Sequence, residues 1–268
     1  MDPALAIEAN LWALHRDFVR LPGAEVHDDP GLLWYRAPSI SSWLNGASRT
    51  NLEPAAADEA IRQVIDSIHP LGRHAMWHVG PSTRPEDFPS RLAAAGFQAP
   101  SPGAAGMAVA LSAVSRPSQP DGVEVRAVRS EGDLVVWIDT FLRSFGKEPQ
   151  GRNHPWFTPF GYLGLDPDGP CRLFTAHVGE DAVSTSLAFV GGGAVGIYGV
   201  GTVPEFRGKG YGSAVTLAAM DWAREMGEEL AILHATEMGQ PVYRRLGFEA
   251  HCTITQWLAK APDLAAAH

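Results

Sequence analysis

The chain has 268 residues, of which 45% are hydrophobic and 19% are charged, and its 28 glycines and 21 prolines follow no repeating period. This composition predicts a soluble globular protein with one large domain or two domains of ordinary size, and it excludes collagen-like and mostly disordered classes. The formal net charge of -9, without any run of Lys or Arg, argues against a nucleic-acid partner.

No segment of the sequence predicts a leader or a membrane span. Residues 1–18 have the pattern of an amphipathic helix, and Asp2 and Glu8 stand where a secretory signal would be basic or apolar. Residues 182–204 carry no charge, but three central glycines at 191–193 lie between β-branched and aromatic residues. This pattern predicts two strands joined by a tight turn.

The two cysteines, Cys171 and Cys252, are too few for a disulfide framework and show no CxxC or Cys/His metal spacing. We therefore expect no metal site, and a cytoplasmic location in which thiols stay reduced.

The sequence repeats one order of elements: a strand, a helix, a strand, a short helix that ends in Gly-Phe, and a final strand. In the N-terminal half we predict these elements at 41–52, 56–69, 75–79, a helix closing at 95–97, and 106–111. In the C-terminal half we predict them at 194–203, 210–226, 230–235, a helix closing at 246–248, and 252–258. A Ser- and Pro-rich segment separates the halves, so we expect two diverged copies of one α/β unit, with domains at 1–115 and 123–268 and a linker at 116–122.

The most informative segment joins the strand at 194–203 to the helix at 210–226, and it contains Arg207-Gly-Lys-Gly-Tyr-Gly212. Glycines at a strand-to-helix junction expose successive backbone N–H groups, and the helix start adds unpaired donors and partial positive charge. Arg207 and Lys209 add full positive charges. The segment therefore predicts a binding site for an anion of the size of a pyrophosphate.

Two common phosphate-binding motifs are excluded. A P-loop requires Gly-Lys followed by Ser or Thr, whereas Lys209 is followed by Gly210. A dinucleotide-binding fold would place GxGxxG after the first strand of its domain, whereas this loop lies late in its domain and has the pattern GxGxG.

The pattern Val-Pro-x-x-Arg-Gly-x-Gly-x-Gly at 203–212, between a strand and a helix, resembles the acetyl-CoA pyrophosphate loop of the GCN5-related N-acetyltransferases, the GNAT family. Residues 236–248, with Tyr243 just before Leu246-Gly-Phe248, resemble the helix of that family that carries a tyrosine. The N-terminal half resembles only a degenerate copy, because its corresponding loop at 49–56 contains no glycine. The resemblance implies an α/β fold of two tandem GNAT-like domains, each a mixed, mostly antiparallel sheet flanked by helices, with acetyl-CoA bound in the C-terminal one.

The resemblance also implies roles for individual residues. The backbone of Val200, Gly201 and Thr202 would pair with the pantetheine arm and offer an N–H to the thioester carbonyl. The pyrophosphate would be held by Arg207, Gly208, Lys209, Gly210, Tyr211 and Gly212. Tyr243 would protonate the departing thiolate.

Two positions depart from the family pattern. Thr236, expected beside the cofactor, stands where many members have an asparagine, and the strand at 194–200 lacks the glutamate that some members use as general base. The base is therefore unassigned.

Other polar and aromatic residues allow two interpretations each. His154, Trp156 and Phe157 lie where a substrate-binding loop would fall, or they anchor that loop to the core. Glu237 either points toward the acceptor amine or is a solvated acid at a helix start. His234 lies inside a predicted strand, where we expect a core histidine with satisfied hydrogen bonds.

We expect an N-acetyltransferase in which the acceptor amine attacks acetyl-CoA directly in a ternary complex. The expected partner is a small-molecule or peptide amine, with no membrane partner and with a homodimer left open. Two alternatives stay open: a CoA-binding regulatory or scaffold protein without turnover, and an acyltransferase that uses a longer acyl-CoA.

Overall fold

The computed structural model describes residues 2–99 and 103–262, whose contacts divide them into two compact units. Unit 1 comprises the described residues within 1–10 and 105–251. Unit 2 comprises the described residues within 11–104 and 252–268.

The two units differ from the sequential domains 1–115 and 123–268 that the repeat suggests. Strand β5 (Ala104–Ala110), expected to end the N-terminal copy, pairs with β10 (Leu230–Ala235) in unit 1. Strand β11 (Glu249–Ala259), expected to end the C-terminal copy, pairs with β4 (Ala75–Val79) in unit 2. Each unit therefore takes its last strand from the other half of the sequence.

The sheet of unit 1 has the strand order β5, β10, β9, β8, β7, β6. Its further strands are β6 (Val123–Ala127), β7 (Cys171–Val178), β8 (Asp181–Gly191) and β9 (Ala194–Thr202). Neighbouring strands are antiparallel except β9 and β10, which are parallel. The charge-free stretch forms the β8–β9 hairpin as predicted, with Gly192 and Gly193 at positive φ in its turn.

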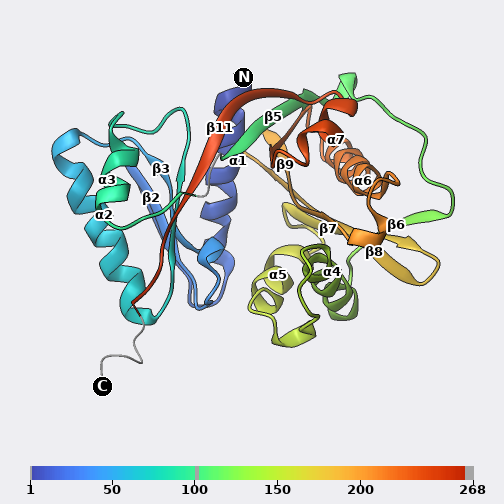
Figure 1. Cartoon of the computed structure of the whole chain (residues 1–268), viewed down its shortest axis with the longest axis horizontal. Coiled ribbons are helices and arrows are strands. Elements are labelled where there is room, and N and C mark those ends of the chain that lie inside the picture. The colour runs from blue at the N-terminus through green and yellow to red at the C-terminus, as the bar shows by residue number, and fades with distance from the viewer. Residues whose placement is uncertain (1, 100–102, 263–268) are drawn as a thin grey trace. The chain divides into compact units, whose positions relative to one another are not determined.

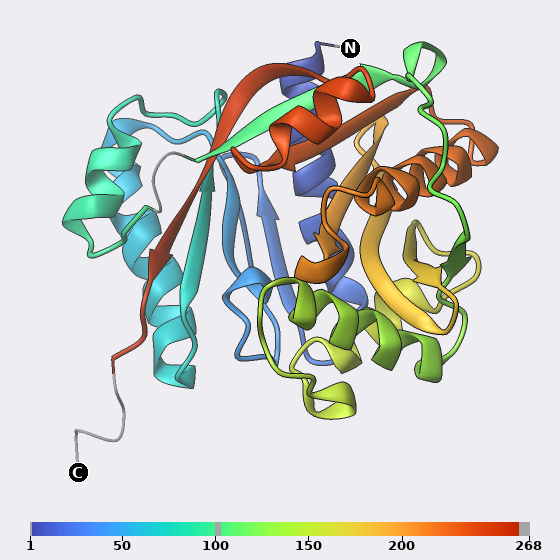
Figure 2. The ribbon, with the colours of Figure 1, turned by 45° about the vertical axis from the view of Figure 1, so that its right-hand side comes forward.

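Helices cover both faces of the unit 1 sheet (Figures 1 and 2). Helices α4 (Glu131–Ser144) and α5 (Phe157–Gly164) lie on one face, and α6 (Tyr211–Glu225) and α7 (Gln240–Arg245) lie on the other. Helix α6 shares a core with β9 and β10, in which Leu217, Met220 and Ile197 are buried. Burial of each large apolar side chain contributes about 1.5–3 kcal/mol, so this core fixes α6 against the two strands.

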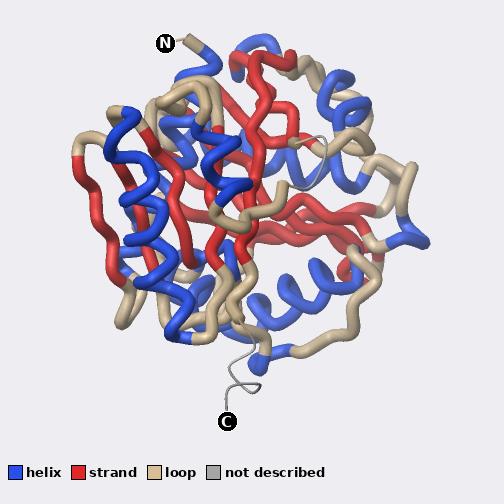
Figure 3. Tube along the Cα trace, turned by 60° about the vertical axis from the view of Figure 1, so that its left-hand side comes forward, coloured by secondary structure: helices blue, strands red, loops and turns tan. Residues whose placement is uncertain are grey.

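Unit 2 has the strand order β1, β2, β3, β4, β11, and only β3 and β4 are parallel. Its remaining strands are β1 (Glu25–Asp29), β2 (Leu32–Arg36) and β3 (Asn45–Thr50), and its helices include α2 (Pro54–Ile68) and α3 (Phe88–Ala94). Figure 3 shows helices beside the strands in both units. Helix α1 (Pro3–Asp17) begins in unit 1 and ends in unit 2. Each unit is thus a mixed, mostly antiparallel sheet flanked by helices, as predicted.

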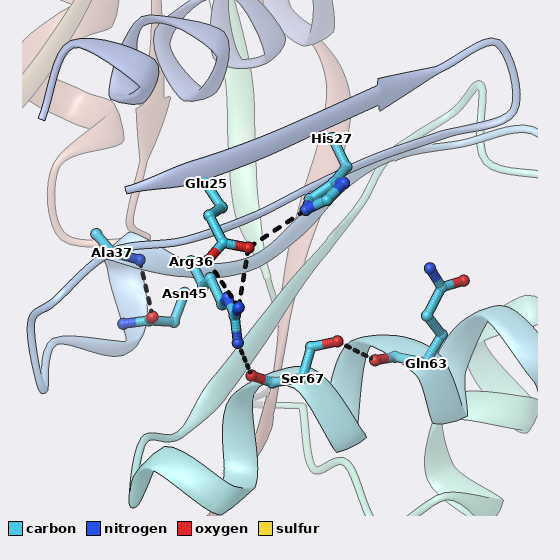
Figure 4. A network of polar contacts seen from close by, with 7 residues as sticks. All are labelled: Glu25, His27, Arg36, Ala37, Asn45, Gln63 and Ser67. Atoms are coloured by element: carbon cyan, nitrogen blue, oxygen red, sulfur yellow. Dashed lines mark hydrogen bonds and ion pairs between the residues drawn. The ribbon is translucent and has the colours of Figure 1, made fainter. Parts of the chain in front are cut away.

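The β1–β2 hairpin of unit 2 was not predicted, because the sequence of β1, EVHDD, has no apolar alternation. Polar contacts link this hairpin to α2 (Figure 4). Arg36 donates through Nη2 to both carboxylate oxygens of Glu25, at 2.7 and 2.9 Å, and through Nη1 to the Ser67 carbonyl at 2.9 Å. The hydrogen bond from Arg36 lowers the pKa of Glu25.

Candidate active site

Strands β9 and β10 separate shortly after they begin to pair. Their parallel pairing joins Val195, Gly196 and Ile197 to Ala231, Ile232 and Leu233 and extends no further among the described residues. Beyond this point β9 continues to Thr202 and β10 continues to Ala235. The part of β9 that follows Ile197 therefore has an edge toward β10 without a partner strand in the described chain.

The opposite edge of β9 is held by β8. The register between the two strands shifts at a bulge, where Gly199 has a φ of 57°. Ser184 Oγ donates to the Gly201 carbonyl at 2.8 Å, and the Val203 N–H donates to the Val183 carbonyl at 3.0 Å. Because backbone groups alternate along a strand, the N–H groups of Val200 and Thr202 point to the unpartnered edge.

The side chains of Val200 and Thr202 contact other parts of the protein, and Gly201 has no side chain. Val200 packs against the core, and Thr202 Oγ1 lies 2.9 Å from Ser184 Oγ. A Cβ at Gly201 would lie 2.1 Å from Ser144 Oγ, so only glycine allows α4 to approach β9 this closely. The expected contribution of 200–202 to a ligand is therefore confined to the backbone.

The loop from β9 to α6 presents a run of unpaired donors. Gly208 and Gly210 have φ of 75° and 89°, and Gly210 is the N-cap of α6. Within the described chain, none of the N–H groups from Gly208 to Ser213 has a hydrogen-bond acceptor. A Cβ placed at Gly208 would meet no atom within 4 Å, whereas one at Gly210 would lie 3.1 Å from Pro120 Cγ.

The cations of the loop have different surroundings. Arg207 braces the loop, because its Nε donates to the Thr202 carbonyl at 3.1 Å and its Nη2 donates to the Ser144 carbonyl at 2.6 Å. Lys209 is exposed, and its Nζ lies 5.2 Å from the centre of the Phe206 ring. The ring of Tyr211 is buried among valines, which leaves only its backbone N–H for a ligand.

Tyr243 lies on α7, on the α6 side of the sheet, in the same core as Ile197 and Leu233. Its side chain is 8% exposed, and its hydroxyl makes no hydrogen bond to a described residue. Burial raises the pKa of Tyr243 to about 12, so the phenol stays protonated at neutral pH. This is a protonated donor without a protein acceptor, which suits a general acid.

Thr236 and Glu237 follow β10 directly. Thr236 Oγ1 accepts from the Gly239 N–H at 3.3 Å, so its hydroxyl stabilises the turn before α7. Glu237 is exposed. Among the described residues, neither side chain makes a hydrogen bond to another residue predicted for the site.

His154 and Trp156 lie in the segment between α4 and α5. The Trp156 ring lies 5.0 Å from Phe141 and 5.5 Å from Phe160, and the Trp156 N–H donates to His154 Nδ1 at 3.3 Å. Burial and the nearby Lys147 lower the pKa of His154. These contacts favour the interpretation in which the two residues anchor the segment to the core. Phe157 begins α5, and Cζ of the Arg152 guanidinium lies 5.0 Å from the centre of its ring.

The sequence analysis assigned no functional role to two residues that lie where β9 and β10 separate. Tyr198 and His234 are the first residues beyond the last parallel pair, and their rings meet edge to face at 5.8 Å. Tyr198 donates its hydroxyl hydrogen to Asn10 Oδ1 at 2.7 Å. His234 Nε2 is buried and has no hydrogen-bond partner among the described residues, so the expectation of a satisfied core histidine is wrong. Only the apolar positions around it gave a signal in the sequence, and they predicted burial alone.

Every described helix is too short or too polar to span a bilayer.

Residues 190–251, which contain β9, the glycine loop and α7, match a family model described as an acetyltransferase (GNAT) domain. A mycothiol acetyltransferase from Thermobifida fusca is 30% identical over 152 residues, which are 50% of this chain and 46% of that protein. The chain spans about half the length of the curated relatives it matches.

Solved structures with the same fold cover nearly the whole chain. A GCN5-related N-acetyltransferase from Kribbella flavida superposes with a TM-score of 0.74 at 19% identity over 99% of both chains. A tandem GNAT protein from the clavulanic acid biosynthesis pathway superposes with a TM-score of 0.61 at 14% identity, over 97% of this chain and 96% of that chain. These likenesses show that the three chains share a fold.

Proposed function

Residues 190–251 belong to the GNAT acetyltransferase domain family, and from this premise we propose that the chain transfers the acetyl group of acetyl-CoA to a primary amine. The proposal rests on two groups of unpaired backbone N–H donors that follow one another along the chain. The unpartnered edge of β9 ends at Thr202, and six residues later, at Gly208, the unpaired N–H groups that lead into α6 begin. An extended amide arm followed by a pyrophosphate matches this order of sites.

The N–H groups of Val200 and Thr202 bind the amide arm and the thioester carbonyl of the proposed substrate. A thioester carbonyl gains negative charge as the amine attacks, and a fixed N–H directed at that oxygen stabilises it. The N–H groups of Gly208 to Ser213 bind the pyrophosphate, and the exposed Lys209 adds a full positive charge there.

Tyr243 is the proposed general acid. The amine nitrogen forms a bond to the thioester carbon, the C–S bond breaks, and the sulfur takes the hydroxyl proton of Tyr243. Burial raises the pKa of the phenol, and it also raises the proton affinity of a thiolate released beside it, so the transfer occurs between two similarly desolvated groups. The nitrogen loses one proton to a base, and the phenolate recovers a proton from water, so the products are the neutral amide and the thiol.

The test combines calorimetry with acetyl-CoA and an assay for thiol release on the full chain. The acceptor panel contains simple amines, amino acids, aminoglycosides, peptides and the acceptor of the mycothiol acetyltransferases. We expect acetyl-CoA to bind and at least one class of amine to release thiol. A folded chain that binds acetyl-CoA and releases no thiol with any of these acceptors would contradict the transfer reaction.

A further inference from the structure

His234 occupies a special position in the unit 1 sheet. It is the first residue of β10 beyond the last parallel pair with β9, so it stands where the two strands begin to separate. Successive residues of a strand point to opposite faces. Leu233 and Ile197 share the core with Tyr243 on the α6 side, and therefore His234 and Tyr198 point to the other face of the sheet.

The surroundings of His234 are rigid. Asn10 donates through Nδ2 to the carbonyls of Phe189, Gly191 and Ala194, at 3.2, 2.8 and 2.9 Å, and this fixes the direction of its Oδ1. That oxygen accepts the Tyr198 hydroxyl at 2.7 Å. A Cβ at Gly196 would lie 2.0 Å from the same oxygen, so the close approach of Asn10 depends on this glycine.

These bonds leave the imidazole without a protein partner. The Tyr198 hydroxyl is committed to Asn10, and the neighbour of His234 in register on β5 is Gly106, which has no side chain. Nε2 of His234 is buried and makes no hydrogen bond within the described chain. A buried polar atom without a partner costs free energy unless a ligand or a reacting group supplies the partner.

We propose that His234 is the general base of the acetyl transfer and accepts the proton of the attacking amine. This rests on the proposed function, which requires such a base. If Nδ1 carries the proton of the neutral ring, the lone pair of Nε2, which no described residue engages, is the one that accepts the amine proton. The acid and the base then act from opposite faces of the sheet, with Tyr243 on the side of the leaving sulfur and His234 on the side of the entering amine.

The amine lone pair forms the C–N bond, and one N–H proton passes to Nε2 of His234, which becomes an imidazolium. The C–S electron pair leaves with the sulfur, which takes the proton of Tyr243. The imidazolium then loses its proton to water while the Tyr243 phenolate gains one from water, so the products are the amide and the free thiol.

The charge state of His234 agrees with this role. Burial lowers its pKa to about 4, so the ring is neutral at neutral pH and can accept a proton. Its ring contacts Tyr198 on β9 and its register partner on β5 is Gly106, and neither of these residues carries a charge at neutral pH. No charged neighbour contributes to the lowered pKa, which has burial as its cause.

The test compares the full-length parent with His234→Gln, which keeps a polar side chain but cannot act as a base. His177→Gln is the matched control, because His177 is also a buried strand histidine of unit 1, and its Nε2 lies 3.0 Å from Thr175 Oγ1. We expect His234→Gln to lose about 10²-fold or more in kcat, within the range for general base catalysis, with acetyl-CoA affinity and the KM for acetyl-CoA nearly unchanged. The loss should become smaller when a strong external base is added, whereas His177→Gln should keep the kcat of the parent.

The possible results distinguish a failure of the role of His234 from a failure of the proposed acetyl transfer. If the parent releases no thiol with any amine, the proposed function and the role of His234 both fail. If the parent is active and folded His234→Gln keeps its kcat, only the role of His234 is overturned. Should His234→Gln not fold, site-specific 2-fluorohistidine at position 234 keeps the shape of the ring with a much weaker base. An unchanged kcat in that protein would overturn the proposal.

Discussion

In each unit two parallel strands pair over a few residues and then separate, but the surroundings of this separation differ between the units. In unit 1 the parallel pair β9–β10 includes Gly196 opposite Ile232, and in unit 2 the parallel pair β3–β4 includes Gly46 opposite Met76. Each pair ends one residue later, and a helix follows the first strand of each pair. The repeat in the sequence therefore corresponds to a repeat in register.

The edge that is unpartnered in unit 1 is filled in unit 2 by the chain itself. The Arg84 N–H donates to the Thr50 carbonyl at 2.9 Å, and the Leu52 N–H donates to the Arg84 carbonyl at 3.2 Å. Asn51 and Arg84 form a parallel bridge. The backbone of residue 84 thus occupies the donors and acceptors that an extended ligand would need beside β3.

The loops that follow these strands also differ. In unit 1, residues 203–210 separate β9 from α6, whereas in unit 2 only residues 51–53 separate β3 from α2. Helix α2 begins with Glu53 as N-cap and Pro54 at its first turn, so one N–H is missing and an acidic residue adds negative charge at the helix start. Under the proposed function, a short loop and one returning segment determine whether a unit of this fold has a pyrophosphate site.

In both units a histidine lies where the two parallel strands separate. His78 follows the last parallel pair on β4, as His234 does on β10. His78 has Gln256 opposite it in register, with the two side chains 3.4 Å apart, whereas His234 has Gly106 opposite it. The glycine leaves the ring of His234 without a side-chain neighbour on that strand, which is the difference on which its proposed role depends.

The largest expected effect comes from the glycine loop. In Gly208→Val the added side chain would occupy space next to the loop in which no protein atom lies within 4 Å of its Cβ, and we expect acetyl-CoA affinity to fall at least about 100-fold. Two lost hydrogen bonds to a charged group account for about 3 kcal/mol or more, which is this factor. Calorimetry on the folded variant measures the loss.

Gly227→Val is the matched control for this variant. Gly227 has a φ of 85°, close to the 75° of Gly208, and a Cβ at either position would meet nothing within 4 Å. Gly227 lies after the C-terminal end of α6, so the two variants introduce similar backbone strain at opposite ends of one helix. Equal affinities in the two variants would refute the placement of the pyrophosphate.

Removal of the Tyr243 hydroxyl should slow the reaction and leave binding intact. Tyr243→Phe keeps the ring that packs 5.9 Å from Phe248, so we expect acetyl-CoA affinity close to that of the parent and a kcat lower by about 10²-fold. The measurement is made at a pH at which the amine is already deprotonated. Tyr162→Phe, at an exposed position, is the control, and a Tyr243→Phe enzyme as fast as the parent would show that the hydroxyl is structural.

The pH dependence of stability gives a smaller effect. Burial lowers the pKa of His234 from 6.5 to about 4 in the folded chain, so the unfolded chain binds more protons between these values and stability falls as the pH falls below about 6.5. At pH 4.5 this amounts to about 2–3 kcal/mol relative to pH 7. His234→Gln should lose correspondingly less stability on acidification, as measured by denaturant unfolding at both pH values. Parallel losses in the parent and the variant would show that the imidazole is not the buried neutral group described.

Local patterns in the sequence predicted the elements around the loop. Residues 230–235 form β10 as predicted, and the helix expected at 210–226 is α6, because apolar periodicity and glycine stops are properties of neighbouring residues. Such local patterns could not predict contacts between segments that are far apart in the sequence. The bond of Arg207 to the Ser144 carbonyl, the return of Arg84 to β3 and the exchange of β5 and β11 depend on pairing over 34 to 184 residues of sequence. The unpartnered state of His234 depends on the bond from Tyr198 to Asn10.

The stoichiometry of acetyl-CoA binding tests the comparison between the units directly. We expect one acetyl-CoA per chain, because in unit 2 the edge of β3 is bonded to Arg84 and the start of α2 carries Glu53 and Pro54 in place of a glycine loop. Calorimetry of the parent should therefore give a single site, and Gly208→Val should abolish the only measurable binding. Two sites in the parent, with one of them surviving in Gly208→Val, would mean that a ligand displaces the Arg84 segment from β3. In that case hydrogen exchange at the Arg84 amide would become faster when acetyl-CoA is added, because its bond to the Thr50 carbonyl is lost, whereas a closed unit 2 predicts no change at this amide.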